Sequence, residues 1–379
     1  MLSNMTAGAI QTMIALFYQA ILLYPYRLLH ATCEPLWGPF MPQDSWVTHV
    51  ISLFGVDMGY YWAHRSMHAS NLGWSTHVTH HNSPDFNYST ALRQGMFERL
   101  FSYSFYLPLA VLGMPCEIMW LHRGFNTIMQ FWTHTQNIPK LWWPIEFVMN
   151  TPSHHWVHHA RNYGRANYGG MLIIWDRLFG SYIEEDIQPV FGLDERKKPL
   201  GTHDPMWQQF HHMYHTFQLM VKTRDPITAW FTREPGPGMI MPRIWKTKDG
   251  APMELQGPPC DPGFGLVDVY TWVNYLVCAA GLLWVMKPEK HGIETHVLYP
   301  ACIWLAASFT IFGHLLDERP WSKYLEVLRL LAFGVGSLFL FEAEVCMRIV
   351  LFSAASLVGL GLCTFAQAQG RRRATAKAA

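Results

Sequence analysis

The chain has 379 residues, of which 50% are hydrophobic and only 15% are charged, and its formal net charge is +1. Charged residues make up about 25% of an ordinary soluble domain, so this shortfall indicates a chain that lies partly in lipid. The near-zero net charge and the lack of a basic recognition motif exclude a nucleic-acid-binding protein.

The first part of the chain contains apolar stretches that suit a membrane, because a spanning helix needs about 20 mostly apolar residues. Residues 8–29 are one predicted span, and residues 46–63 are a second that runs directly into a histidine-rich segment. Residues 97–134 form a longer apolar region with a break near Gly113-Met-Pro115. This break predicts two helices or a re-entrant pair.

A second group of apolar stretches follows a polar and mixed middle region. Residues 233–265 are rich in proline and glycine, which predicts a loop. Four further spans are predicted, at about 266–286, 297–316, 324–341 and 344–366. The chain ends in a basic segment, and basic residues beside a span favour the cytoplasmic side. We therefore place the C-terminus and the histidine-rich segments on that side.

This order predicts an all-α, multi-pass integral membrane protein whose cytosolic helical cap contains a histidine-rich site for two metal ions. Five regions are expected: an N-terminal membrane helix and linker (1–45), a histidine-bearing catalytic domain (46–232), a Pro/Gly-rich loop (233–265), C-terminal membrane helices (266–369) and a basic cytosolic tail (370–379).

Three short boxes contain nine of the twenty histidines. They are His64-Arg-Ser-Met-His68, His77-Val-Thr-His80-His81 and His154-His155-Trp-Val-His158-His159. Residues three or four apart lie on one face of a helix, so each box can direct two or three imidazoles at one point. Neutral imidazole is a common ligand of iron, copper and zinc. We predict one site with two metal ions and with coordination positions left for oxygen or water.

Other histidines are weighed singly. His134 ends an apolar helix between the second and third boxes and is predicted to be a ligand, with a structural histidine as the alternative. His154 cannot share the direction of its neighbour His155, so it is expected to support a ligand or to be an alternate one. His211 and His215 belong to a weaker candidate group, and the remaining histidines are expected to be structural.

Missing motifs narrow the chemistry further. No His-Glu-x-x-His occurs, which excludes a helix-borne zinc protease site. No Glu-x-x-His occurs, which excludes the carboxylate-bridged di-iron bundle of soluble proteins. No glycine-rich nucleotide fingerprint occurs, so no flavin or nicotinamide domain is expected within the chain. We infer that an all-histidine set around iron suits a strongly oxidising species.

The flanks of the boxes are as distinctive as the histidines. The relevant stretches are Asp57-Met-Gly-Tyr-Tyr-Trp-Ala-His-Arg65, His80-His-Asn-Ser-Pro-Asp-Phe-Asn-Tyr-Ser-Thr-Ala-Leu-Arg-Gln94, Phe131-Trp-Thr-His-Thr135, Asn150-Thr-Pro-Ser-His-His155, Asn167-Tyr-Gly-Gly-Met-Leu-Ile-Ile-Trp-Asp-Arg-Leu-Phe-Gly180 and Leu315-Leu-Asp-Glu-Arg-Pro320. Together they resemble the fatty acid hydroxylase superfamily, which includes sterol desaturases, and within it the alkylglycerol monooxygenase branch.

The resemblance implies a non-heme di-iron enzyme of the endoplasmic reticulum membrane that uses O2 and tetrahydrobiopterin. Such an enzyme hydroxylates the carbon next to the ether oxygen of a glyceryl ether lipid, and the product separates into a fatty aldehyde and a glycerol derivative. The implied catalytic residues are His64, His68, His77, His80, His81, His155, His158 and His159, and the implied metal ligands are these together with His134 and His154.

Two alternatives to this function stay open. One is a sterol desaturase or fatty acyl hydroxylase that receives electrons from a b-type cytochrome, and the other is a metal transporter of the membrane. The chain also departs from the resemblance at Ala69, where similar enzymes usually have glutamate. Box one begins at His64, after less membrane sequence than such enzymes usually have.

A few other polar or aromatic residues near the boxes have two interpretations each. Asp57 is either an acceptor for a ligand N–H or a polar residue at a helix contact, and Arg93 meets phosphate or pterin or is an interfacial anchor. The tryptophans of Leu141-Trp-Trp-Pro144 indicate a membrane-interface belt rather than a stacking platform. Asn167 and Tyr168 either position cofactor or substrate or form a plain turn.

Overall fold

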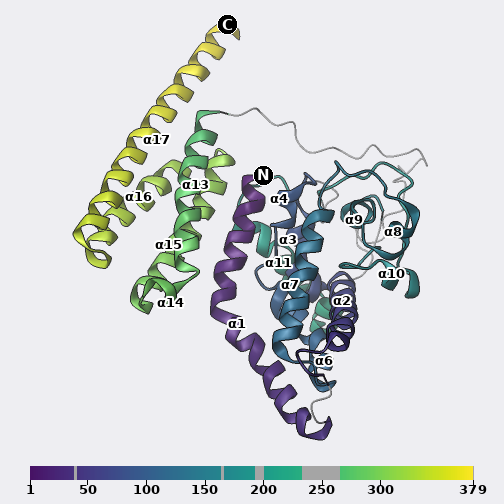
Figure 1. The fold of residues 1–379 in the computed structure, drawn as a ribbon. Coiled ribbons are helices and arrows are strands. Elements are labelled where there is room, and N and C mark those ends of the chain that lie inside the picture. Colours follow the sequence, from purple (N-terminus) through teal and green to yellow (C-terminus); the bar gives the residue numbers. More distant parts are fainter. Residues whose placement is uncertain (38–40, 164–165, 193–199, 233–264, 379) are drawn as a thin grey trace. The chain divides into compact units, whose positions relative to one another are not determined.

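The computed structural model describes residues 1–37, 41–163, 166–192, 200–232 and 265–378 (Figure 1). Within these ranges the chain forms helices and one isolated β-bridge, between Met149 and Leu172, and no strand. The predicted all-α architecture is confirmed. The predicted Pro/Gly-rich loop lies outside the described residues except at its last position, residue 265.

The chain divides into two compact units, which are described separately. The N-terminal unit comprises Ser3–Gly201 and Trp207–Pro259, and it contains all three histidine boxes. The C-terminal unit comprises Thr202–Met206 and Cys260–Ala379.

Among the described residues, three helices are long and apolar enough to cross a membrane: α13 (Leu266–Val285), α15 (Thr295–Leu316) and the part of α17 (Ala343–Ala378) that ends at Gln369. A fourth is α1 (Leu2–Trp37), if its two halves, bent by 45°, count as one span. The chain is therefore a membrane protein. The predicted spans at 46–63 and 324–341 do form helices, but their crossing of the membrane stays a prediction.

A tight corner between α2 (Trp46–Ala69) and α3 (Asn71–His81) brings the first two boxes together. Ser70 ends α2 and caps α3, because its side chain accepts a hydrogen bond from the N–H of Gly73. A Cβ on Gly73 would lie 2.6 Å from the Cα of Met67, so only glycine permits this approach. Helix α2 also packs against α7 (Cys116–Thr133), as Figure 1 shows.

The break predicted near Gly113-Met-Pro115 is present, and α7 begins directly after it. Gly113 has a φ of +83°, a conformation that glycine adopts freely. Before the break, however, the chain forms no long helix. It forms α5 (Glu98–Ser102), the 3₁₀ helix η1 (Tyr103–Tyr106) and α6 (Leu107–Val111). This part packs into a buried core, and the hydroxyl of Tyr26 in α1 donates to the carbonyl of Met114.

Further helices, most of them short, lie between residues 88 and 231, and one of them carries the third box. They are α4 (Tyr88–Ala91), α8 (Trp143–Val148), α9 (Pro152–His159), α10 (Ile174–Leu178), α11 (Pro205–Thr223) and α12 (Pro226–Phe231). Helix α9 carries the box and begins at Pro152, a residue suited to a first helical turn.

The C-terminal unit consists of α13, α14 (Pro288–His291), α15, α16 (Ser322–Leu340) and α17. A buried polar network joins these helices. The guanidinium of Arg329 bonds to the carboxylate of Glu326, to Asn274 of α13 and to Ser308 of α15. Because the two charges neutralise each other within the unit, they do not indicate a transport pathway.

Candidate metal centre

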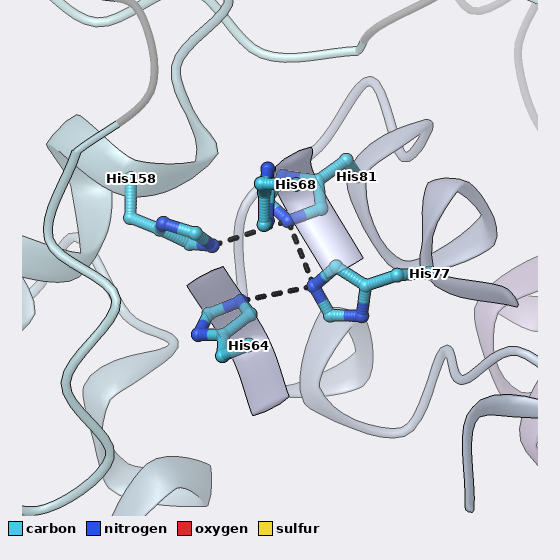
Figure 2. A group of neighbouring side chains, drawn as sticks. All are labelled: His64, His68, His77, His81 and His158. Atoms are coloured by element: carbon cyan, nitrogen blue, oxygen red, sulfur yellow. Dashed lines mark hydrogen bonds between the residues drawn. The ribbon is translucent and has the colours of Figure 1, made fainter. Parts of the chain in front are cut away.

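Eight of the nine box histidines gather into two buried groups, to which His134, directly after α7, also contributes. The five-histidine group consists of His64, His68, His77, His81 and His158 (Figure 2). The four-histidine group consists of His80, His134, His155 and His159. Within each group, the nitrogen atoms that can bind a metal all lie within 4.8 Å of one another.

Helical periodicity explains how the boxes are divided. His77 and His81 are one turn apart on α3 and enter the five-histidine group, whereas His80 points to the other group. On α9, His155 and His159 are again one turn apart, and both enter the four-histidine group. Boxes two and three therefore each contribute to both groups, rather than to one point each as the spacing predicted.

The two groups adjoin. The rings of His81 and His159 stack with centroids 4.4 Å apart, and the rings of His77 and His80 lie 5.2 Å apart. Aromatic side chains close the outer sides: Trp74 lies 5.0 Å from His68 between ring centroids. Two ions held by these groups would be neighbours shielded from water.

Burial favours the neutral form of several of these imidazoles. It lowers the pKa of His80 to about 4 and that of His158 to about 3, with the surrounding histidines adding to the effect. The pKa values of His81, His155 and His159 are also lowered, again mainly by burial. Neutral imidazoles have a free nitrogen lone pair at physiological pH, which is the form that binds a metal.

Backbone carbonyls fix which nitrogen carries the proton. The Nδ1 atoms of four histidines lie 2.7–2.9 Å from a carbonyl oxygen: His64 from Tyr168, His80 from Arg93, His134 from Gln130 and His158 from Ala166. Because a carbonyl only accepts hydrogen bonds, Nδ1 of each ring carries the proton and Nε2 presents its lone pair.

The geometry of the Nε2 atoms fits bound cations. Nε2 of His80 and Nε2 of His134 are 3.2 Å apart, and both carry lone pairs, so they repel each other without a positive charge between them. Nε2 of His64 and of His77 are similarly close, at 3.0 Å (Figure 2). Imidazole nitrogens bind first-row metals at about 2.0–2.1 Å, so two ligands at right angles are about 3 Å apart. The residues therefore fit two metal ions.

Comparison with known proteins gives the family. Residues 49–181 match the model of the fatty acid hydroxylase family. The chain is 34% identical over 341 residues to human alkylglycerol monooxygenase, which covers 88% of this chain and 74% of the human protein. It is 33% identical over 338 residues to the alkylglycerol monooxygenase of Danio rerio, with 86% and 73% covered. The chain belongs to the alkylglycerol monooxygenase family.

Other relatives are more distant from this family member. A probable Delta(7)-sterol 5(6)-desaturase of Neurospora crassa is 29% identical over 164 residues, which is 42% of this chain and 44% of that protein. No solved structure matches the chain.

His154 lies outside both histidine groups of this alkylglycerol monooxygenase family member. Its Nε2 is 2.9 Å from a carboxylate oxygen of Glu146, and its Nδ1 accepts from the backbone N–H of Thr151. Burial alone would raise the pKa of Glu146. Hydrogen bonds from His154 and from the N–H of Leu141 outweigh burial, and the pKa of Glu146 is lowered to about 2. Glu146 is thus a carboxylate, and it holds the start of α9 in place beside His155.

Two more residues singled out in the sequence support the site without facing it. Asp57 accepts from the N–H groups of Met171 and Leu172 and from the side-chain amide of Asn126 in α7, so it fixes a loop and also lies at a helix contact. Arg93 is buried, and its guanidinium bonds to Thr79 and to other polar groups of the protein rather than to the membrane interface. Its own carbonyl accepts from His80, so Arg93 holds box two.

Asn167 and Tyr168 lie in a turn that contacts two histidines of the boxes. Asn167 has a φ of 56° and donates to the carbonyl of His154, while the carbonyl of Tyr168 accepts from His64. Asp176, which the sequence reasoning missed, accepts from the N–H groups of Tyr168 and Gly169 and thereby holds this turn. Its only sequence signal is its place in the segment that resembles the family.

The weaker candidates do not converge on a site. His212 bonds to Asn71, and His211 and His215 contact Gln208 and Gln218, so these histidines contribute to neither group. The side chain of Ala69 is exposed at the end of α2.

Proposed function

We propose that this chain is a non-heme di-iron monooxygenase that uses O2 and tetrahydrobiopterin to hydroxylate the carbon next to the ether oxygen of glyceryl ether lipids. The observation that supports it most is the pair of adjoining all-histidine groups, whose nitrogen lone pairs face one another, in a member of the alkylglycerol monooxygenase family. Imidazole sets suit iron, copper and zinc, and iron is the choice that provides oxygen chemistry on an unactivated C–H bond.

The irons would supply the activation of O2, and the pterin would supply two electrons. One oxygen atom enters the substrate and the other leaves as water, and the resulting hemiacetal separates into a fatty aldehyde and a glycerol derivative. The chain's own residues hold the ligands: backbone carbonyls fix the tautomers of His64 and His80. Trp74, and Phe86 on the four-histidine side, keep bulk water from the ions.

The proposed substrate enters from the bilayer. Helices α2 and α7 pack together and expose large hydrophobic side chains. Examples are Phe54 and Met58 on α2 and Phe125 and Ile128 on α7. Trp142 and Trp143 are also exposed, at 71% and 70%, as residues of an interfacial belt would be. We infer that the membrane is that of the endoplasmic reticulum, with O2 and the glyceryl ether as the reaction partners.

The test uses membranes that contain the protein, an alkylglycerol and tetrahydrobiopterin, with fatty aldehyde as the measured product. A parallel assay with NADH and a b-type cytochrome in place of the pterin tests the sterol desaturase or fatty acyl hydroxylase alternative. We expect aldehyde only with the pterin. Aldehyde formation that needs the cytochrome instead, or no aldehyde at all, would contradict the proposal.

A ligand variant and a matched control complete the assay. His80→Ala removes one nitrogen of the four-histidine group and should abolish aldehyde formation. His296→Ala removes an exposed histidine of the C-terminal unit and should leave aldehyde formation unchanged.

A further inference from the structure

One ligand has a carboxylate beside its outer nitrogen. Nδ1 of His77 lies 3.5 Å from Oε2 of Glu98, whereas the Nδ1 atoms of His64, His80 and His158 face backbone carbonyls. Both Nδ1 of His77 and Oε2 of Glu98 are buried and have no other hydrogen-bond partner among the described residues. Nε2 of His77 faces the five-histidine group.

The place of Glu98 is fixed by the chain around it. A Cβ on Gly95 would lie 1.7 Å from the carbonyl oxygen of Thr76, so only glycine lets this segment press against box two. Gln209 of α11 holds the same segment from its other side, by accepting from the N–H of Met96 and donating to the carbonyl of residue 94. The carboxylate is therefore held against His77 by the fold, and is not a free surface side chain.

We propose that Glu98 is the positioning residue of His77 and makes the five-histidine group the tighter of the two metal sites. This inference rests on the proposed function, because it assumes two bound ions. A carboxylate accepts a hydrogen bond from a ligand's N–H more strongly than a carbonyl does, which makes the opposite nitrogen a better donor to the metal. Its negative charge also offsets the charge of the ion. Among the described residues, no carboxylate forms an ion pair with a histidine of the four-histidine group.

The experiment measures how iron leaves the purified protein when a chelator is added. The wild type should release its two irons in two phases, with the slower phase from the five-histidine group. Glu98→Gln, which keeps the shape but removes the charge, should speed the slower phase about 10- to 100-fold and leave the faster phase unchanged. Release from Glu98→Gln at the wild-type rate in both phases would overturn the inference.

Three comparisons separate the role of Glu98 from a general loss of structure. Glu184→Gln removes an exposed carboxylate that pairs with Lys140 and should release iron like the wild type. Glu98→Asp keeps the charge and should fall between wild type and Glu98→Gln. The visible absorption of the cobalt(II)-loaded protein should change in Glu98→Gln and not in Glu184→Gln; a cobalt spectrum identical to that of the wild type would count against the inference, whatever the stability of the variant.

Failure of this inference differs from failure of the proposed function. If the wild type binds no iron, or binds iron and forms no aldehyde, the proposed function is wrong. If the wild type binds two irons and forms aldehyde while Glu98→Gln behaves identically, only the role of Glu98 is wrong.

Discussion

In the C-terminal unit, the buried guanidinium of Arg329 lies 2.7 Å from the carboxylate of Glu326 and 3.1 Å from the amide oxygen of Asn274. In the N-terminal unit, the buried rings of His80 and His134 instead present two lone pairs to each other at 3.2 Å. Buried polar groups normally find partners inside the protein. The polar groups around Arg329 have such partners and join helices together. The lone pairs of His80 and His134 need a cation between them. This difference separates structural polar burial from a ligand site.

Removal of the metal ions should give the largest effect on this difference between the two regions. A ligand that binds only the folded state adds about 2.7 kcal/mol of stability once its free concentration is 100 times its Kd, so two ions add about 5 kcal/mol. Chelator-treated protein should therefore unfold at a clearly lower temperature and lose aldehyde formation, and added iron should restore both. An unfolding midpoint that the chelator does not change would show that the histidine groups are satisfied without metal.

Breaking the ion pair in the other unit should give a large effect of a different kind. Arg329→Met leaves the Glu326 carboxylate buried without its partner, which costs about 3–5 kcal/mol. Replacing both residues, with Glu326→Leu added, should recover most of that stability because no buried charge then remains. Thermal unfolding of both variants measures this, and iron analysis should show two ions in the double variant. Loss of iron from the double variant would contradict the structural role.

The sequence was sufficient for the features that depend on local pattern. The three boxes, their helical spacing and the break at Gly113 all follow from residues a few positions apart, and His134 was singled out by its place at the end of an apolar helix. Features that depend on long-range approach were not predictable. The two backbone N–H groups that bond to Asp57 lie 114 and 115 residues further along the chain, and helical periodicity cannot say which turn of α3 meets which turn of α9.

Two neighbouring histidines test the distinction between a metal ligand and a structural polar group within the site itself. His155→Ala removes a member of the four-histidine group and should lower the bound iron to about one ion per chain. His154→Ala should retain both ions and cost about 1–3 kcal/mol of stability, because the buried Glu146 carboxylate then lacks its donor. Iron analysis and thermal unfolding of the two variants give the comparison. If His154→Ala loses iron as His155→Ala does, then His154 is a ligand after all.

The smallest effect is expected at position 69, where similar enzymes usually have glutamate. The side chain of Ala69 is exposed at the end of α2, while the adjacent His68 turns inward to the five-histidine group. Surface substitutions away from special features change stability by about 0.5 kcal/mol or less. Ala69→Glu should therefore leave the unfolding midpoint, the iron content and aldehyde formation unchanged, in contrast to Glu98→Gln. A gain in iron content or activity in Ala69→Glu would show that a carboxylate at position 69 does reach the site, and that the exposed end of α2 is part of the metal centre.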